Sequence, residues 1–436
     1  MLRIFENIKQ NQFAKNVSVL ASGTIIVQGI SILLSPVLSR LYTPEDYGLL
    51  AVFISCISVL IVIGSFRYEL AILIPKESAE ANALLILSIG INIIFAAVIF
   101  VLTLIFNSSL SVLLGNEKIS FWLYFIAPVF LASGISQSLT SWYNRNKNYK
   151  LISGVRIYQS SINSVFSLGL GFLKFNSVGL IVSQIVSQIL SSMYIIKRSA
   201  LSLRQFSFSI PELKKTAKKH IEFPAYSLPS ALLDVFSINS VIFLLNYFFT
   251  ESVTGAYSFS LRILTLPTVV IGAAIGQVFY QKISEAYSNN EKITTSIFKT
   301  WKVLFIIGIV PAITIFFFGE QLFDFIFGSK WAVAGEVSSY LCILTLVNFV
   351  SSPTSSAMIV LKKQKIVLIV NVITFIYRPL AIMYGYYTDN FLNGIILYVV
   401  LEIIQIFFYN FFLLRSAARS DSELNTTRNN KNGTGL

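Results

Sequence analysis

Long apolar runs alternate with short polar interruptions along the whole chain. Many of these runs reach the roughly 18–20 residues that a helix needs to cross a bilayer core of about 30 Å. Turn signals and charge clusters separate about twelve spans, which we place near 16–38, 47–74, 80–106, 121–143, 151–173, 177–196, 224–247, 253–279, 301–319, 333–360, 366–387 and 391–414. The pattern predicts an all-α polytopic membrane protein with about 12 transmembrane helices.

The polar break "SRLYTPEDYGLL" (39–50) predicts a tight, capped turn between the first two spans. Thr43 stands at an N-cap position, Pro44 at the first helical position and Asp46 at the third. These residues are typical of a capping box, in which the threonine and the acid each bind a backbone N–H group of the other. We therefore expect one helix to end here and the next to begin at once.

The second half of the chain repeats this turn in weaker form. Thr250 and Gly255 follow Thr43 and Gly48 at an offset of 207 residues, but Val253 replaces the acid. "LLGNEK" (113–118) and "NRNKNYK" (144–150) are echoed in order by "IFGSKW" (326–331) and "VLKKQK" (360–365). An even number of spans in each half makes the repeat parallel. We predict a six-helix bundle, a basic cytoplasmic linker, a second six-helix bundle and a disordered cytoplasmic tail, at 1–196, 197–222, 223–415 and 416–436.

The net charge of +13 is distributed unequally between the two sides of the membrane. If the N-terminus, alternate loops and the C-terminus share one side, the opposite loops hold only Arg40, Lys118, Lys174 and Lys330. Because Lys and Arg favour cytoplasmic loops, this distribution predicts that both termini are cytoplasmic. The basic charge thus follows from topology, and we expect no nucleic-acid partner.

Cysteine and histidine are too scarce to suggest a metal centre or a disulfide framework. Cys56 and Cys342 both lie within apolar spans, and His220 is the chain's single histidine. No phosphate-binding loop of the Walker A type is present in the sequence. We therefore expect no cofactor, no metal and no ATP-driven step.

Four ionisable residues, Asp234, Arg262, Arg378 and Glu402, fall within roughly one helical turn of the bilayer midplane. Charges at this depth are costly, so they mark functional sites or buried ion pairs. Each lies on a polar stripe of its own span at helical spacing. We interpret these stripes as the lining of a water-filled cavity, with polar contacts between helices as the alternative.

Two further arginines lie in the first half. Arg156 heads a stripe on span five with Gln159, Asn163 and Ser167. Arg67, in "GSFRYELAILIP" (64–75), lies near the inner end of span two. Either that helix is long and tilted, so that Arg67 reaches a cavity, or the arginine extends to the membrane surface.

Three stretches carry a family resemblance: "LSPVLSRLYTPEDYGLLAVF" (34–53), "GSFRYELAILIPKESAEANALLILS" (64–88) and "IEFPAYSLPSALLDVFS" (221–237). The chain resembles the polysaccharide-synthesis branch of the MOP exporter superfamily, the Wzx-like O-antigen flippases. The resemblance covers nearly the whole chain. It implies two six-helix bundles around a central cavity that opens alternately to either side of the bacterial inner membrane. The implied substrate is an oligosaccharide repeat unit on polyprenyl pyrophosphate. The implied driving force is a proton or sodium gradient.

The implied site combines cations for the phosphates with carboxylates for the ion. The resemblance carries over only Arg67 and Asp234 by position, whereas Arg262, Arg378 and Glu402 are chosen for their depth and Arg156 for its polar stripe. We predict that Arg67, Arg156, Arg262 and Arg378 bind the substrate, because a guanidinium group suits phosphate oxygens. The acids Asp234 and Glu402 either couple transport to the ion or pair with the midplane arginines Arg262 and Arg378. Implied partners are the lipid-linked oligosaccharide, membrane lipids, a polysaccharide polymerase and a chain-length regulator.

Two other classes compete with the flippase. A drug/ion antiporter of the MATE branch shares the architecture, but its cationic substrates favour an acidic cavity. The arginines in the spans of this chain argue against that class. A membrane polysaccharide polymerase would need a large outer loop for its catalytic residues, and all the predicted outer loops are short. We therefore expect a transporter and not an enzyme.

Overall fold

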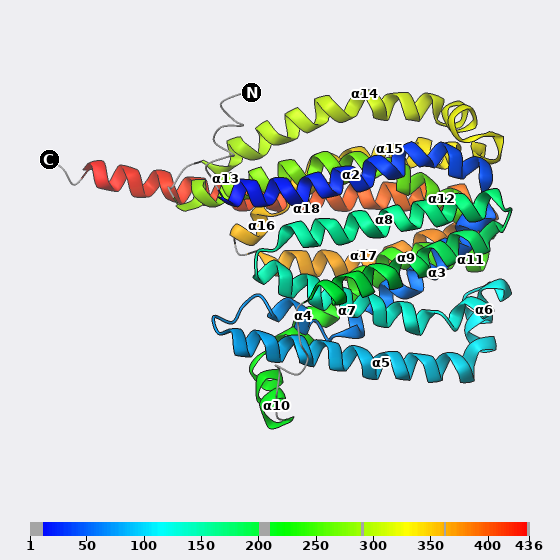
Figure 1. Cartoon of the computed structure of the whole chain (residues 1–436). Coiled ribbons are helices and arrows are strands. Elements are labelled where there is room, and N and C mark those ends of the chain that lie inside the picture. Colours follow the sequence, from blue (N-terminus) through cyan, green and yellow to red (C-terminus); the bar gives the residue numbers. More distant parts are fainter. Residues whose placement is uncertain (1–11, 200–209, 289–291, 362, 434–436) are drawn as a thin grey trace. The chain divides into compact units, whose positions relative to one another are not determined.

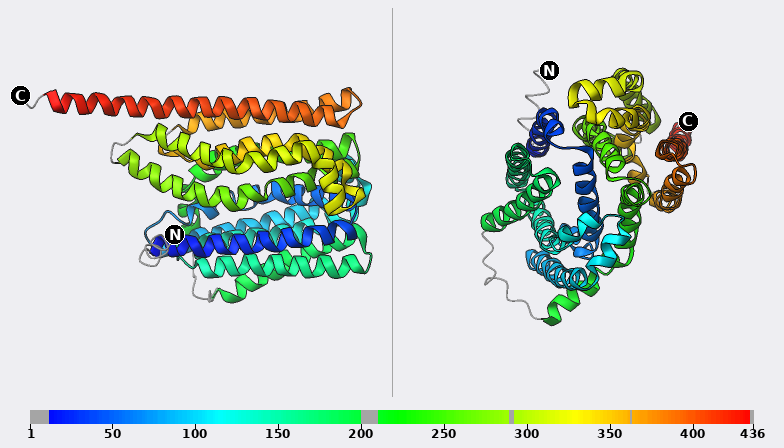
Figure 2. Two further views of the ribbon diagram at one scale, coloured as in Figure 1. Left: turned by 90° about the horizontal axis from the view of Figure 1, so that it is seen from above. Right: turned by 90° about the vertical axis from the view of Figure 1, so that its right-hand side faces the viewer.

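The computed structural model describes residues 12–199, 210–288, 292–361 and 363–433. Contacts within the chain divide it into unit 1 (residues 1–258) and unit 2 (residues 259–436). In the described residues all regular secondary structure is helical, and within each unit long helices run alongside one another (Figures 1 and 2). The predicted all-α class is confirmed. The predicted repeat boundary at 197–222 stays a prediction.

Unit 1 contains the helices of the first half of the chain together with α11. The elements are α2 (Gln12–Leu41), α3 (Pro44–Gly64), α4 (Tyr68–Ala71), α5 (Ser78–Leu113), the 3₁₀ turn η1 (Glu117–Ile119), α6 (Ser120–Leu123), α7 (Ile126–Arg145), α8 (Tyr149–Phe172), α9 (Asn176–Arg198), α10 (Ile210–Lys219), the π turn η3 (Phe223–Ser227), α11 (Leu228–Phe248) and the first part of α12 (Glu251–Leu264).

Unit 2 begins inside α12 and continues to the end of the chain. Its further elements are the π turn η4 (Thr268–Gly272), α13 (Ala273–Ser288), α14 (Ile293–Phe327), the 3₁₀ turn η5 (Ser329–Trp331), α15 (Ala332–Ser351), the 3₁₀ turn η6 (Ser352–Thr354), α16 (Ala357–Val360), α17 (Gln364–Tyr387) and α18 (Phe391–Gly433).

Most of the predicted spans are apolar enough to cross a membrane. Nine helices within the described ranges pass that test, and the bent pair Glu117–Leu123 and Ile126–Arg145 adds a tenth. The predicted spans at 151–173 and 253–279 are also helical, as α8 and as α12 with α13. Their polar stripes lower the mean hydropathy, and helices of this kind need polar neighbours inside a bilayer.

The turn at 39–50 forms the predicted capping box. Asp46 N–H donates to Thr43 Oγ1 at 3.4 Å, and Thr43 N–H donates to Asp46 Oδ2 at 2.9 Å. In the second copy Val253 N–H donates to Thr250 Oγ1 at 3.2 Å, without an acid to complete the box. Both helix starts therefore follow the sequence pattern.

The two copies of this turn also pack against each other through glycines. A Cβ atom on Gly48 would overlap the Glu251 carbonyl, and one on Gly255 would overlap the Pro44 carbonyl. At the offset of 207 residues, Gly48 corresponds to Gly255 and Pro44 corresponds to Glu251. Each contact is therefore the counterpart of the other, and the packing is reciprocal. Only glycine permits so close an approach of two backbones.

Local geometry recurs elsewhere in the two halves. Gly115 and Gly328 both have a positive φ, at 68° and 101°, and each is followed by a 3₁₀ turn. The preceding helices α5 and α14 each carry a kink, at Phe106 and Phe318. These similarities agree with a parallel duplication of one helical pattern.

The predicted continuous span 47–74 is wrong, because the helix breaks. Helix α3 ends at Gly64, and Phe66 and Arg67 adopt left-handed conformations with φ of 50° and 64° before α4 begins at Tyr68. Such conformations cost on the order of 1 kcal/mol or more per residue. The buried Glu69 compensates by accepting hydrogen bonds from Ser65 and Gln137.

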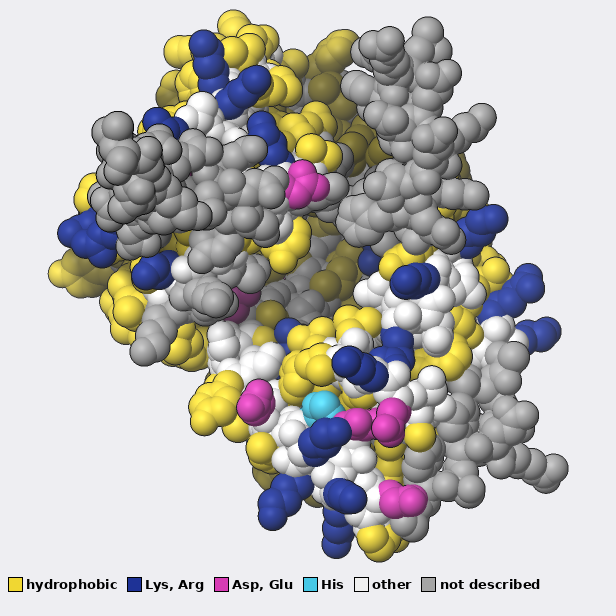
Figure 3. Space-filling view, turned by 90° about the vertical axis from the view of Figure 1, so that its left-hand side faces the viewer, with side chains coloured by type: hydrophobic (Ala, Val, Ile, Leu, Met, Phe, Trp, Pro, Cys, Tyr) yellow, Lys and Arg dark blue, Asp and Glu magenta, His cyan; other side chains and the backbone are white. Residues whose placement is uncertain are grey.

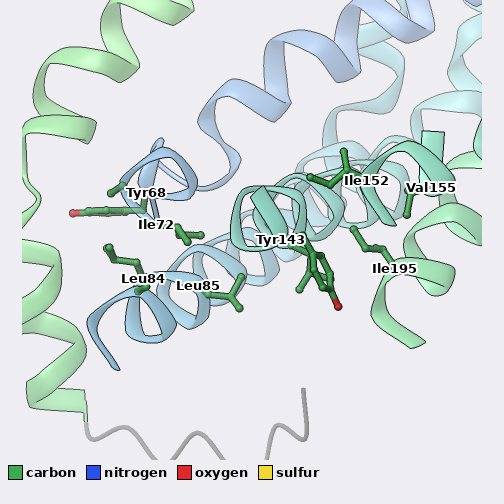
Figure 4. Close-up of a cluster of buried hydrophobic side chains, with 11 residues drawn as sticks. Tyr68, Ile72, Leu84, Leu85, Tyr143, Ile152, Val155 and Ile195 are labelled. Carbon is green, nitrogen blue, oxygen red and sulfur yellow. The ribbon is translucent and has the colours of Figure 1, made fainter. Parts of the chain in front are cut away.

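A hydrophobic core fixes the helices around this break. Buried side chains from α4, α5, α7, α8 and α9 meet in one cluster (Figure 4), which includes Tyr68, Ile72, Leu84, Leu85, Tyr143, Ile152, Val155 and Ile195. Val155 is buried in this cluster and the next residue, Arg156, is exposed. The core therefore fixes the rotation of α8 and with it the direction of its polar stripe.

The C-terminal tail, predicted as disordered from 416, is helical through Gly433. Leu413 and Ala417 are fully buried against helices α13 and α14 of unit 2. Asp421 then accepts hydrogen bonds from Ile293 N–H at 2.8 Å and Thr294 N–H at 3.1 Å, which caps the N-terminus of α14. A carboxylate at this position satisfies free backbone donors and the helix dipole. Packing and this cap account for the longer helix.

Part of the predicted basic linker forms the amphipathic helix α10, whereas residues 200–209 lie outside the described ranges. His220 Nε2 lies 2.7 Å from Glu80 Oε1, and Lys219 Nζ also lies 2.7 Å from that oxygen. In Figure 3 the histidine lies among basic and acidic side chains. Lys214 and Lys215 remain exposed on α10, as expected for a helix at an anionic membrane surface.

Candidate functional site

A polar pocket of about 320 Å³ lies in unit 1 between α2, α8 and α9. These three helices run side by side, with α8 packed against both of the others (Figures 1 and 2). Helix α2 contributes Thr24, Val27 and Gln28, helix α8 contributes Arg156, Gln159, Ser160 and Asn163, and helix α9 contributes Gln184 and Ser187. The pocket thus combines one cation with amide and hydroxyl groups and contains no acid.

Amide pairs join α8 to α9 along one side of this pocket. Gln159 Nε2 donates to Gln188 Oε1 at 2.7 Å, and Asn163 Nδ2 donates to Gln184 Oε1 at 3.1 Å. Asn163 also donates to Ser187 Oγ at 3.4 Å. These bonds hold the two helices together and set the amide groups one helical turn apart.

The polar side chains of three pocket residues make no hydrogen bond or ion pair within the described part of the chain: Gln28, Arg156 and Ser160. Polar groups among membrane-spanning helices are costly unless water, a ligand or another side chain satisfies them. A guanidinium group beside free amide and hydroxyl groups suits a ligand that carries both an anion and hydroxyls.

Arg67 occupies a different place in unit 1. It precedes α4 at the helix break, and its Nη1 lies 3.6 Å from Glu69 Oε1. The Glu69 side chain is 1% exposed and that of Arg67 is 23% exposed. Arg67 Nε is buried without a hydrogen-bond partner, and Arg67 does not line the Arg156 pocket. The structure therefore does not bring these two predicted residues into one pocket.

Unit 2 pairs two of the predicted midplane charges. Arg378 Nε on α17 lies 2.5 Å from Glu402 Oε1 on α18, and their side chains are 13% and 5% exposed. Arg378 lies near the middle of α17, and Glu402 lies eleven residues after the start of α18. The pairing neutralises each charge within the helical bundle, so neither group is an isolated ion.

The other two midplane charges have no such partner. Arg262, on α12 in unit 2, is exposed and makes no side-chain hydrogen bond or ion pair among the described residues. Asp234, on α11 in unit 1, is half-buried and equally without a partner in the described ranges. Of the two predicted acids, Asp234 alone is therefore left unpaired within that part of the chain.

Sequence reasoning missed the pocket residues on α2 and α9. Thr24 and Gln28 are four residues apart, as are Gln184 and Gln188, so each pair shares one helix face. That spacing was a usable signal, but neither stripe contains a charge to draw attention to it. Within the described residues no group of three or more His, Cys, Asp or Glu could hold a metal ion.

The fold and the pocket define a class: a multi-pass membrane protein with a polar pocket between three of its helices. The family model of polysaccharide biosynthesis proteins matches residues 37–336. The chain belongs to this family, which confirms the resemblance seen in the sequence.

Relatives and solved structures agree with this class. The chain is 22% identical over 335 residues to the succinoglycan biosynthesis transport protein ExoT of Rhizobium meliloti, a match that covers 75% of this chain and 64% of that protein. The lipid II flippase MurJ in an inward closed conformation has a TM-score of 0.73 at 12% identity, covering 97% of this chain and 93% of that one. An inward-facing multidrug resistance MATE family transporter of the MOP superfamily has a TM-score of 0.65 at 17% identity, with coverage of 94% and 98%.

The Arg378–Glu402 pair yields a stability prediction. Arg378→Met leaves Glu402 buried without its partner, which costs about 3–5 kcal/mol. The double variant Arg378→Met/Glu402→Leu removes both charges and should recover most of that loss. Thermal unfolding of the purified protein in detergent measures the effect. An Arg378→Met protein as stable as the wild type would contradict the pairing.

Proposed function

We propose that this protein is a flippase that moves a lipid-linked oligosaccharide repeat unit, carried on polyprenyl pyrophosphate, from the cytoplasmic to the outer leaflet of the bacterial inner membrane. Both termini are cytoplasmic in this proposal. The observation that carries it is the unpaired Arg156 in an amide-lined pocket among membrane-spanning helices. Family membership and the named transport function of the Rhizobium relative support the assignment.

The chemistry of the substrate explains this pocket. A sugar–pyrophosphate group cannot cross hydrocarbon without hydrogen-bonding partners, because each unsatisfied polar group costs several kcal/mol there. Arg156 supplies a cation for a phosphate oxygen, and the neighbouring amides supply donors and acceptors. The pocket thereby replaces water around the head group. Alternating access exposes the pocket to each side of the membrane in turn.

Asp234 is the acid proposed to couple transport to a proton or sodium gradient. It has no partner in the described residues, whereas Glu402 is occupied by Arg378. An unpaired carboxylate can take up and release a cation without first breaking an ion pair. The protein partners in this proposal are a polysaccharide polymerase and a chain-length regulator, to which the flippase would deliver repeat units.

Export of cationic drugs is the second candidate, because a MATE transporter shares the fold. The Arg156 pocket opposes that candidate. A guanidinium group repels a cationic drug, and no acid lines the pocket to offset that repulsion.

Loss of the Arg156 cation should stop delivery of surface polysaccharide. In a strain that lacks the chromosomal gene, we expect Arg156→Ala to reduce surface polysaccharide at least about tenfold, the effect of losing about 1.4 kcal/mol of binding. Immunoblotting should show normal protein in the membrane. Lys174→Ala, which removes an exposed cation outside the pocket, is the matched control. Wild-type polysaccharide levels in the Arg156→Ala strain would refute the assignment.

Asp234 can be tested separately from binding. Asp234→Asn keeps the size of the side chain and removes its charge, so the variant should bind the lipid-linked oligosaccharide and lose its response to an imposed ion gradient. Transfer between the leaflets of reconstituted vesicles, with and without a proton or sodium gradient, measures this response. A variant that responds like the wild type would exclude Asp234 as the coupling group.

A further inference from the structure

The amide side of the Arg156 pocket differs chemically from its cationic end. Apart from Val27, the remaining lining is formed by side-chain amides and hydroxyls of α2, α8 and α9. Phosphate oxygens accept hydrogen bonds, whereas a sugar hydroxyl both donates and accepts. Amides also do both, so they match hydroxyl groups better than they match a phosphate. We propose that this part of the pocket is a carbohydrate subsite, which holds one sugar ring through its hydroxyl groups.

The order of side chains along α8 supports this division. Arg156, Gln159 and Asn163 succeed one another by about one turn, so the α8 backbone rises about 10 Å from the arginine to the asparagine. This length accommodates a sugar ring and the phosphate attached to it. Arg156 contacts the anionic group, and the amides beyond it contact the ring that follows.

The amide pairs keep part of their hydrogen-bonding capacity. An amide has two N–H donors and an oxygen with two acceptor sites. Gln159 uses Nε2 toward Gln188, and Gln184 uses Oε1 toward Asn163. Gln159 Oε1 and the Gln184 amide nitrogen therefore remain available to hydroxyl groups, while the existing bonds hold them in a fixed geometry.

Helix packing alone does not account for the pocket. It explains the bonds between α8 and α9, since polar pairs commonly join membrane helices. It does not explain Gln28 on α2 and Ser160 on α8, which line the same pocket without a partner among the described residues. These two side chains are the ones that a bound sugar would satisfy.

The inference rests on the proposed function and is tested by binding instead of transport. The probe is the repeat-unit oligosaccharide of the host's own surface polysaccharide, released from its lipid, with and without the phosphate at its reducing end. Saturation-transfer NMR with the purified protein in detergent measures its affinity. Gln28→Leu and Ser160→Ala should each weaken binding of both forms about fivefold or more. Neither variant should change the melting temperature, because neither side chain bonds within the described fold.

Arg156→Ala, by contrast, should affect the two forms of the probe differently. It should weaken binding of the phosphorylated form at least tenfold and leave binding of the phosphate-free form nearly unchanged. Gln321→Leu, the same glutamine substitution on an exposed face of α14, is the matched control and should bind both forms like the wild type.

The outcomes separate the subsite from the transport function. If Gln28→Leu and Ser160→Ala bind the phosphate-free saccharide like the wild type, the carbohydrate subsite is wrong. The carbohydrate subsite is also wrong if the wild-type protein exports polysaccharide but does not bind the phosphate-free saccharide. If Arg156→Ala strains also make normal surface polysaccharide, the proposed function fails together with the subsite.

Discussion

Inside a lipid bilayer every polar group needs a partner, and this requirement organises the structure. Most polar side chains in the described spans find one close by. Serines and threonines donate to carbonyls of the preceding turn, as Ser88 does to Leu84 at 2.8 Å. The buried charges of unit 2 pair across helices, Arg378 with Glu402. The α2–α8–α9 pocket differs, because it gathers three polar side chains that have no such partner among the described residues, and this is the basis for assigning a ligand to it.

The fold makes that pocket possible through close packing elsewhere. The reciprocal contacts of Gly48 and Gly255 bring two duplicated helix starts together at their backbones. The cluster around Ile152 and Val155 sets the rotation of α8. With these constraints in place, the polar stripe of α8 is directed to α2 and α9, where amide pairs complete the wall.

The sequence predicted what depends on local patterns. The spans follow from apolar run length, the turn at Thr43 from capping chemistry, and the polar face of α8 from helical spacing. What depends on tertiary contact could not be predicted. The break after Gly64 requires left-handed residues that are compensated by Glu69, a partner whose burial becomes visible only in the fold.

Ion pairs and helix caps between residues far apart in the sequence also depend on tertiary contact and could not be predicted. Sequence placed Arg378 and Glu402 at one depth but left open whether they meet. It gave no hint that Asp421 caps a helix 128 residues earlier. The helical spacing of Gln28 and Gln184 is visible in the sequence, but neither stripe contains a charged residue that would mark it as a site.

The central claim is that the sugar–phosphate head group occupies the pocket between α2, α8 and α9. Photocrosslinking from adjacent positions on α2 tests it most directly. Val27 lines the pocket, whereas Ile26 is 46% exposed and is not part of its lining. In cells that make the polysaccharide, a photoreactive residue at position 27 should form an adduct with a carbohydrate-bearing lipid, and one at position 26 should not. Equal labelling at both positions, or no carbohydrate adduct at 27 in a protein that still exports polysaccharide, would contradict the account.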